Sequence, residues 1–269
     1  MVATHRFRVT AALGLAACTA LLALGGCGTV AGPTCSDSGP TTCVRVLFLG
    51  NSYTYVNDLP GTFAQLSQSG GHPVQVAMVA NGGETLAEHS VSSDSMKELS
   101  SQSWNFVVLQ EQSEIPSVAG SRSASMYPAA RTLVDRIEAG RATPLFFMTW
   151  AHRDGLPASG MPGYERMQLA IEDGYQGIAR ELGVPVAPVG YAWFVVRRAH
   201  PEIGLWQDDG SHPTAAGTYL AACVFYAAIF RQSPEGLTFE GGLAEAQARV
   251  LQAEAGRSVL DLQAQWGLR

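Results

Sequence analysis

The sequence lacks any run of lysine or arginine beyond its first few residues, and charged residues make up only 15% of its 269 positions. Its formal net charge is −6. A protein that binds the phosphate backbone of nucleic acid needs a basic stripe or patch. Nucleic acid is therefore excluded as an expected partner.

The common metal-binding spacings are absent too. No C-x-x-C pair and no H-E-x-x-H segment occurs, so neither a structural zinc site nor a zinc peptidase is expected. Two of the five cysteines, Cys35 and Cys43, flank the loop "SDSGPTT" and are expected to form a disulfide in an oxidising compartment. Cys223 lies in the apolar run "AACVFYAAIF" and is expected to be a buried thiol.

The N-terminus carries the pattern of a secretory signal peptide. Arg6 and Arg8 precede the apolar stretch "VTAALGLAACTALLALGGC", and the glycines near its end disfavour a permanent transmembrane helix. Residues 1–26 are therefore predicted to be removed. They hold Arg6, Arg8 and no acidic residue, so the mature chain keeps 15 basic and 23 acidic residues, a net charge of −8.

The end of this stretch, "LALGGCG", resembles a bacterial lipoprotein signal, which implies a lipid on Cys27. The segment "LAAC" at 15–18 fits the same short pattern but would leave a shorter apolar stretch, and a plain secreted protein is the other alternative. Residues 27–42 are rich in Gly, Pro, Ser and Thr and are predicted to be a flexible tether. The protein is thus expected outside the cytoplasm, either held at a membrane only by its lipid or secreted.

From residue 43 onward, short apolar segments alternate with helical ones, without internal repeats. Strands are predicted at 44–49, 73–80, 104–110, 143–150 and 184–189. Helices are predicted at 59–71, about 122–140, 161–182, 213–230 and 243–265. This alternation predicts a parallel sheet covered by helices on both faces, in one α/β domain over 43–269.

Polar or glycine-containing turns follow the first three predicted strands, where a parallel sheet places its functional loops. They read "GNSYT", with Ser52, then "NGGETLAEH" and "QEQSEIP". A fourth, "QDDGSHP", precedes the helix predicted from 213. Asn-Ser is good turn chemistry, so Ser52 alone does not distinguish a simple turn residue from a nucleophile.

The order of these motifs resembles the SGNH (GDSL-like) hydrolase family, over nearly the whole chain after the tether. "FLGNSYT" matches the Gly-x-Ser turn of the family, and "DGSHP" matches its Asp-x-x-His block. The G-x-S-x-G elbow of α/β-hydrolases is absent because Thr54 replaces its second glycine. The resemblance implies a flavodoxin-like three-layer α/β/α sandwich with a central parallel sheet. It also implies a serine esterase that needs no metal or organic cofactor.

A serine hydroxyl becomes a useful nucleophile when a neighbouring base takes its proton. The resemblance makes Ser52 the nucleophile, His212 the base and Asp209 the group that orients the base. Asp208 is the alternative orienting group. A helix-entry histidine before Pro213 is the non-catalytic interpretation of His212.

The resemblance also implies an oxyanion hole with three donors: the backbone N–H of Ser52, a glycine N–H from Gly82 or Gly83, and a side chain after the third strand. The family's Gly-x-Asn-Asp is missing there. Gln110 or Gln112 is expected to replace the asparagine, as the Gln of "QGE" does in sialate and xylan acetylesterase relatives. The spacing leaves the choice between the two glutamines open.

Substrate contacts are expected from Asn51, Trp150 and His152, with Trp150 stacking on a sugar or acyl group; a solvated loop at 149–155 is the alternative. The expected substrates are short-acyl esters, in particular O-acetyl groups on carbohydrate. An acyltransferase or lysophospholipase could use the same triad. A non-catalytic glycan-binding lipoprotein is the alternative from another class.

Overall fold

Five strands form the central sheet of the computed structural model, which describes Cys35 and residues 43–268. Their order is β2 (Val74–Ala80), β1 (Val44–Gly50), β3 (Phe106–Leu109), β4 (Thr143–Phe147) and β7 (Val186–Ala187). Every neighbouring pair is parallel. The inner strands β1 and β3 are almost continuously apolar because helices cover both of their faces.

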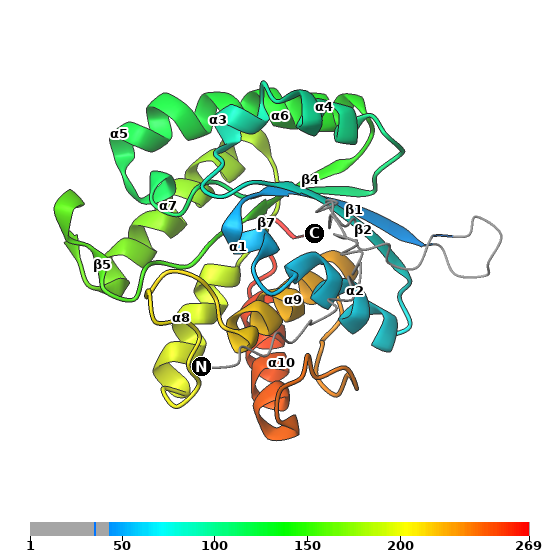
Figure 1. The fold of residues 1–269 in the computed structure, drawn as a ribbon, viewed down its shortest axis with the longest axis vertical. Helices are drawn as coiled ribbons and strands as arrows, with labels where there is room; N and C mark the ends of the chain where they lie inside the picture. The colour runs from blue at the N-terminus through cyan, green and yellow to red at the C-terminus, as the bar shows by residue number, and fades with distance from the viewer. Residues whose placement is uncertain (1–34, 36–42, 269) are drawn as a thin grey trace, which may run out of the picture.

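Helices cover the two faces of the sheet as separate layers (Figure 1). One layer holds α3 (Leu86–His89), α4 (Ser93–Leu99), α5 (Ala119–Ser121), α6 (Tyr127–Ala139) and α7 (Tyr164–Leu182). The other holds α2 (Leu59–Ser69), α8 (Val189–Ala199), α9 (Ala215–Phe230) and α10 (Glu245–Leu260). The predicted three-layer α/β/α sandwich with a central parallel sheet is therefore confirmed.

Phenylalanines join β1 to the α2/α9 layer. Phe48 of β1 packs edge-on against Phe225 of α9, with ring centroids 5.3 Å apart, and against Phe63 of α2 at 6.3 Å. All three rings are fully buried, and burying a side chain of this size contributes about 1.5–3 kcal/mol. This packing anchors β1, the strand that leads to Ser52, in the hydrophobic core.

Several short elements were not predicted. The helix predicted from residue 161 starts at Tyr164, because Met161–Pro162 (β6) pairs antiparallel with Gly155–Leu156 (β5). Other short elements, besides α3 and α5, are α1 (Ser52–Tyr55), η1 (Ile115–Ser117), the π-helical η2 (Arg122–Met126) and η3 (Pro157–Ser159). Elements of two to five residues are too short to produce a hydrophobic period.

Among the described residues, two cysteines form a disulfide and one is a free thiol. Cys35 and Cys43 are joined by a disulfide, with their Cα atoms 5.4 Å apart, and Cys223 is buried in α9. The predicted signal peptide at 1–26, the lipidation of Cys27 and most of the tether fall outside the described residues. Between residues 43 and 268, no helix combines the length and apolar character needed to cross a membrane.

Candidate active site

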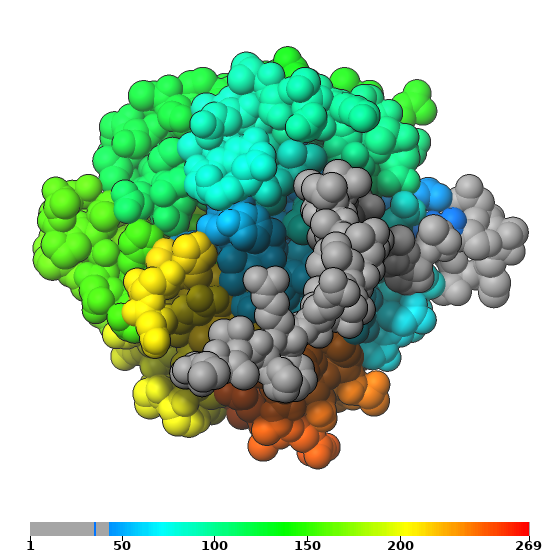
Figure 2. All heavy atoms as spheres, viewed as in Figure 1, coloured from blue at the N-terminus to red at the C-terminus, as the bar shows by residue number. Residues whose placement is uncertain are grey.

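Ser52 is the first residue of the one-turn helix α1, immediately beyond the carboxyl end of β1. The side chain of Asn51 caps this turn by accepting the N–H of Tyr53 at 3.1 Å. In the space-filling view, the blue segment around residue 52 is bordered by the cyan segment that follows β2 and by the yellow segment near residue 210 (Figure 2). Three distant parts of the chain therefore meet at this turn.

His212 bridges Ser52 and Asp209. Its Nε2 lies 2.9 Å from Ser52 Oγ, and its Nδ1 lies 2.5 Å from Asp209 Oδ2. A carboxylate only accepts, so Nδ1 carries the proton and Nε2 is left to accept from the serine hydroxyl. This is the arrangement that a general base needs in order to activate a hydroxyl.

The turn that holds Asp209 is built to keep its carboxylate ionised. Although desolvation opposes ionisation, hydrogen bonds from the His212 side chain and from the backbone N–H groups of Ser211 and His212 lower the pKa of Asp209 to about 2. Gly210 adopts φ +70° in this turn, a conformation that favours glycine. The carboxyl beside His212 is that of Asp209, whereas Asp208 meets Arg153 through its backbone carbonyl.

Aromatic rings pack against His212 and bind the loop that carries it. The His212 ring packs edge-on against Tyr53, with centroids 5.9 Å apart, and Tyr53 stacks on Trp150 at 4.3 Å. The Tyr53 hydroxyl lies 2.7 Å from Ser211 Oγ, and Trp150 Nε1 donates to the Ser211 carbonyl at 2.9 Å. These rings therefore fix the loop that carries His212.

The prediction that Trp150 stacks on a substrate is wrong. Its side chain is fully buried, and Tyr53 and Trp193 cover its two faces at centroid distances of 4.3 and 4.1 Å. The predicted substrate contact of Asn51 is wrong as well, because Asn51 is 2% exposed. Its amide donates to the Glu84 carbonyl and accepts from Gln110 Nε2, each at 2.9 Å.

The two glutamines after β3 differ in their surroundings. Gln110 is fully buried, and its Nε2 already donates to Asn51 Oδ1 at 2.9 Å and to the Glu111 carbonyl at 2.6 Å. The expectation that Gln110 donates to an oxyanion is therefore wrong. Gln112 is only partly buried, and its Nε2 makes one long contact, 3.3 Å to Ser113 Oγ. One N–H of Gln112 has no partner among the described residues, so Gln112 stays the predicted donor.

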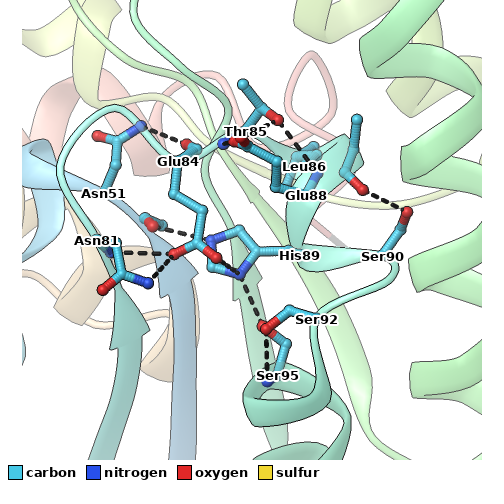
Figure 3. Close-up of polar contacts among 12 residues, drawn as sticks. Asn51, Asn81, Glu84, Thr85, Leu86, Glu88, His89, Ser90, Ser92 and Ser95 are labelled. Carbon is cyan, nitrogen blue, oxygen red and sulfur yellow. Dashed lines mark hydrogen bonds and ion pairs between the residues drawn. The ribbon is translucent and has the colours of Figure 1, made fainter.

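Gly82 and Gly83 form an exposed turn between β2 and α3. Gly83 has φ +72°, which favours glycine, and a Cβ on Gly82 would approach Tyr55 Oη to 3.5 Å. The turn is fastened to Asn51, the residue before Ser52, through the bond from Asn51 Nδ2 to the Glu84 carbonyl (Figure 3). Both glycines stay predicted oxyanion donors.

No family model and no curated protein matches the sequence. Among solved structures, a protein of Slackia heliotrinireducens assigned to the SGNH hydrolases is 31% identical, with a TM-score of 0.57, and the match covers 69% of this chain and 98% of that one. The chain belongs to the SGNH hydrolase family. It is therefore an SGNH-type serine hydrolase.

Two more distant structures share the fold. A DUF4886 family protein from Bacteroides uniformis has a TM-score of 0.66 at 20% identity, and the match covers 81% of this chain and 95% of that one. An acetyl xylan esterase has a TM-score of 0.56 at 13% identity, with 69% and 100% covered. Within the part of this SGNH hydrolase that the structure describes, no cluster of three or more His, Cys, Asp or Glu side chains could hold a metal ion.

His152 lies at the rim of the SGNH site, after β4. It is partly buried, and its Nε2 lies 3.1 Å from Oγ of Ser113, the neighbour of Gln112. Burial lowers the pKa of its imidazole. The contact of His152 with substrate stays a prediction.

Sequence reasoning missed two buried ionisable residues of this SGNH hydrolase, His89 and Glu111. His89 lies under the nucleophile turn, and its Nε2 is 2.8 Å from the Gly50 carbonyl oxygen. Glu111 joins two loops of the site, because its Oε1 accepts the N–H groups of Leu86 at 3.1 Å and Gln112 at 2.7 Å. No motif marks either residue, so only the packing of the loops identifies them.

Glu111 should make the stability of the protein depend on pH. Burial raises the pKa of Glu111 from 4.5 to about 7, against the effect of its hydrogen bonds from Gln112 and Leu86. The folded protein then binds a proton that the unfolded chain has lost, so stability is full below the unfolded pKa and falls as pH rises through the folded one. This shift corresponds to a loss of about 3 kcal/mol by pH 8.

Glu111→Gln keeps an acceptor for both N–H groups and removes the titration. We expect the free energy of unfolding of the wild type to fall, relative to that of Glu111→Gln, between pH 4.5 and 8. Urea unfolding of both proteins across this range measures the difference. Parallel curves would show that Glu111 titrates normally.

Proposed function

We propose that this SGNH hydrolase is an extracytoplasmic serine esterase that cleaves short-acyl esters, with O-acetyl groups on carbohydrate as its substrate class. One observation carries the proposal: His212 contacts the Ser52 hydroxyl through Nε2 while Asp209 contacts Nδ1. These contacts supply a nucleophile, its base and an orienting carboxylate.

In the first half of the reaction, Ser52 Oγ attacks the ester carbonyl carbon and its proton passes to Nε2 of His212. The carbonyl oxygen becomes an oxyanion that accepts hydrogen bonds from the N–H of Ser52, from Gly82 or Gly83, and from Gln112 Nε2. Each such donor is worth about 3–4 kcal/mol in the transition state. The intermediate then collapses, the C–O bond to the alcohol breaks, and His212 gives its proton to the departing oxygen.

In the second half, His212 takes a proton from a water molecule as that water attacks the acyl group on Ser52. A second oxyanion forms in the same place and collapses, which breaks the bond to Ser52 Oγ. The proton on His212 returns to the serine, and the carboxylic acid leaves. The mechanism uses no metal or organic cofactor.

The substrate class is supported by the relatives and by the polar rim of the site. Two structurally similar proteins are an acetyl xylan esterase and an acetyl-xylooligosaccharide esterase from Geobacillus. Gln112, Ser113 and His152 place amide, hydroxyl and imidazole groups at the rim, and such groups can bind the hydroxyls of a sugar. The Cys35–Cys43 disulfide supports an oxidising compartment, and Cys27 is the proposed lipid anchor.

The test of substrate class compares p-nitrophenyl acetate with p-nitrophenyl octanoate, using residues 28–269 and Ser52→Ala as the blank. We expect kcat/KM for acetate to exceed that for octanoate by about tenfold or more. A preference for octanoate would contradict the short-acyl assignment and favour a lysophospholipase. Acetyl arriving on an acceptor sugar faster than acetate is released would identify an acyltransferase.

A further inference from the structure

The strand β1 separates from β3 just before the nucleophile, while Gly50 still pairs with Ala80 of β2. The ladder between β1 and β3 ends at Leu49 and Leu109, after which the Gln110 N–H still donates to the Leu49 carbonyl at 2.9 Å. The next peptide unit, whose C=O belongs to Gly50 and whose N–H belongs to Asn51, is buried where water cannot hydrate it. Buried backbone groups need partners.

Two buried side chains bind the two ends of this single peptide unit. On one side, Gln110 Oε1 accepts the Asn51 N–H at 2.9 Å. On the other side, His89 Nε2 lies 2.8 Å from the Gly50 carbonyl oxygen. A carbonyl oxygen only accepts, so His89 is the donor in this pair. Ser52 is attached directly to the residue held in this way.

Each of these side chains is itself held in place. Gln110 also accepts from Thr54 Oγ1 at 2.9 Å and donates to Asn51 Oδ1 at 2.9 Å. A Cβ on Gly50 would lie 2.6 Å from Gln110 Oε1, so residue 50 has to be glycine for the glutamine to reach the peptide. The peptide unit and the side chain of Gln110 are therefore packed against each other without spare room.

The other partner, His89, is fully buried at the end of α3 (Figure 3). Its Nδ1 lies 2.8 Å from Ser95 Oγ and 3.5 Å from Glu84 Oε1. Because Nε2 carries the proton, a neutral ring accepts the Ser95 hydroxyl at Nδ1. Glu84, in turn, binds the Asn51 amide through its own backbone carbonyl. The support of the nucleophile turn thus extends from the loop after β2 to the loop after β3.

We propose that Gln110 and His89 are positioning residues that fix the Gly50–Asn51 peptide unit and so hold Ser52 Oγ at hydrogen-bonding distance from His212. This inference rests on the proposed function, because it assigns these residues a role through the nucleophile. Neither residue contacts the Ser52–His212–Asp209 atoms in the hydrogen bonds described above. A displacement of about 1 Å at a reacting atom can cost about a hundredfold in rate, so a small rotation of this peptide is sufficient to matter.

The test uses a pair of substitutions at His89. His89→Gln places an amide donor near the position of Nε2, whereas His89→Asn is too short to reach Gly50. Gln110→Met keeps the shape of the side chain and removes the bonds at the other end of the peptide. His200→Asn, at a histidine that contacts Glu202 and Glu254 away from the site, is the matched control.

The readouts are the rate and the final stoichiometry of labelling by a fluorophosphonate, together with kcat and KM for p-nitrophenyl acetate. The final stoichiometry counts folded sites, so a slow rate at full stoichiometry reports positioning and not unfolding. We expect His89→Asn and Gln110→Met to label about 10–100 times more slowly, with a matching fall in kcat and little change in KM. His89→Gln should recover most of the rate, and His200→Asn should match the wild type.

The outcomes separate this inference from the function on which it rests. If the wild type itself is not labelled at Ser52, the proposed function fails. If the wild type is labelled and His89→Asn and Gln110→Met label at its rate, the positioning role is overturned. Should neither variant fold, Ser95→Ala decides, because it keeps the imidazole and removes only the hydroxyl at Nδ1. A slower rate in Ser95→Ala then supports the role, and an unchanged rate overturns it.

Discussion

Ser52→Ala is expected to lower kcat for p-nitrophenyl acetate by about 10⁴-fold or more, and His212→Ala by a similar factor. In the proposed mechanism, the serine supplies the atom that attacks, and the histidine, 2.9 Å away, takes its proton. We expect neither Ser52 nor His212 to support the reaction without the other. The double variant should therefore be no slower than either single variant.

Steady-state kcat of the two single variants and the double variant tests this expectation. Their thermal unfolding should stay close to that of the wild type, because Ser52 and His212 are only partly buried. Losses that multiply in the double variant would mean that the two side chains act independently. Such a result would argue against a nucleophile activated by its neighbouring base.

Asp209→Asn is the second large expected effect, a fall in kcat of about 10⁴-fold near pH 7. The carboxylate accepts the Nδ1 proton of His212, which leaves Nε2 free to take the proton of Ser52. An amide nitrogen facing Nδ1 favours the opposite tautomer, in which Nε2 is protonated and cannot act as a base. The backbone bonds to Oδ1 can persist, so the loss comes from the tautomer and not from a misfolded turn.

Asp208→Asn is the matched control, because Asp208 is the adjacent carboxylate and the carboxyl on His212 Nδ1 is that of Asp209. We expect its kcat to stay within about twofold of the wild type, as for most surface substitutions. Equal losses in the two variants would show that the turn needs negative charge and not one oriented carboxylate.

The pH profile gives an independent check on Asp209. Its folded pKa of about 2 lies below the ordinary value, so the carboxylate stays ionised from neutral pH down to about pH 2. The activity lost on acidification above that pH must then come from another group. An Asp209 carboxyl that takes up its proton over the same pH range as the acid limb of kcat/KM would contradict this assignment.

The sequence predicts most of the large elements, because their signals are local. The inner strands β1 and β3 are apolar runs long enough to recognise, and helices such as α9 have clear length and composition. The hairpin of β5 and β6 consists of two residues on each side, too few for any alternation. Elements of this size depend on tertiary contacts that a single sequence does not display.

The residues of the site likewise divide into those with a local sequence signal and those that depend on tertiary contacts. The spacing of Asp209 and His212 is a local property of one turn, and it predicts which side chains converge. The predictions for Trp150, Asn51 and Gln110 are wrong because the burial of these side chains depends on segments far away, such as Trp193 over Trp150. Gln110 continues the line of β3 and meets the end of β1, whereas Gln112 lies two residues farther on, past the strand. The two glutamines thus have different surroundings, and their spacing in the sequence does not reveal this difference.

His89 and Glu111 could not be recognised in advance for a related reason. Each makes its decisive contact across the fold: His89 with Gly50, and Glu111 with Leu86. A single histidine or glutamate in a loop is usually solvated, and nothing in "AEH" or "QEQ" indicates burial. Such residues become visible only when the loops at the carboxyl edge of the sheet are assembled.

The most direct test of the central claim is to treat the wild-type protein with a fluorophosphonate and locate the label by peptide mass spectrometry. The account predicts one label per chain, on Ser52, absent in Ser52→Ala and strongly slowed in His212→Ala. A wild-type protein that takes no label, or that takes it on a residue other than Ser52, would contradict the account.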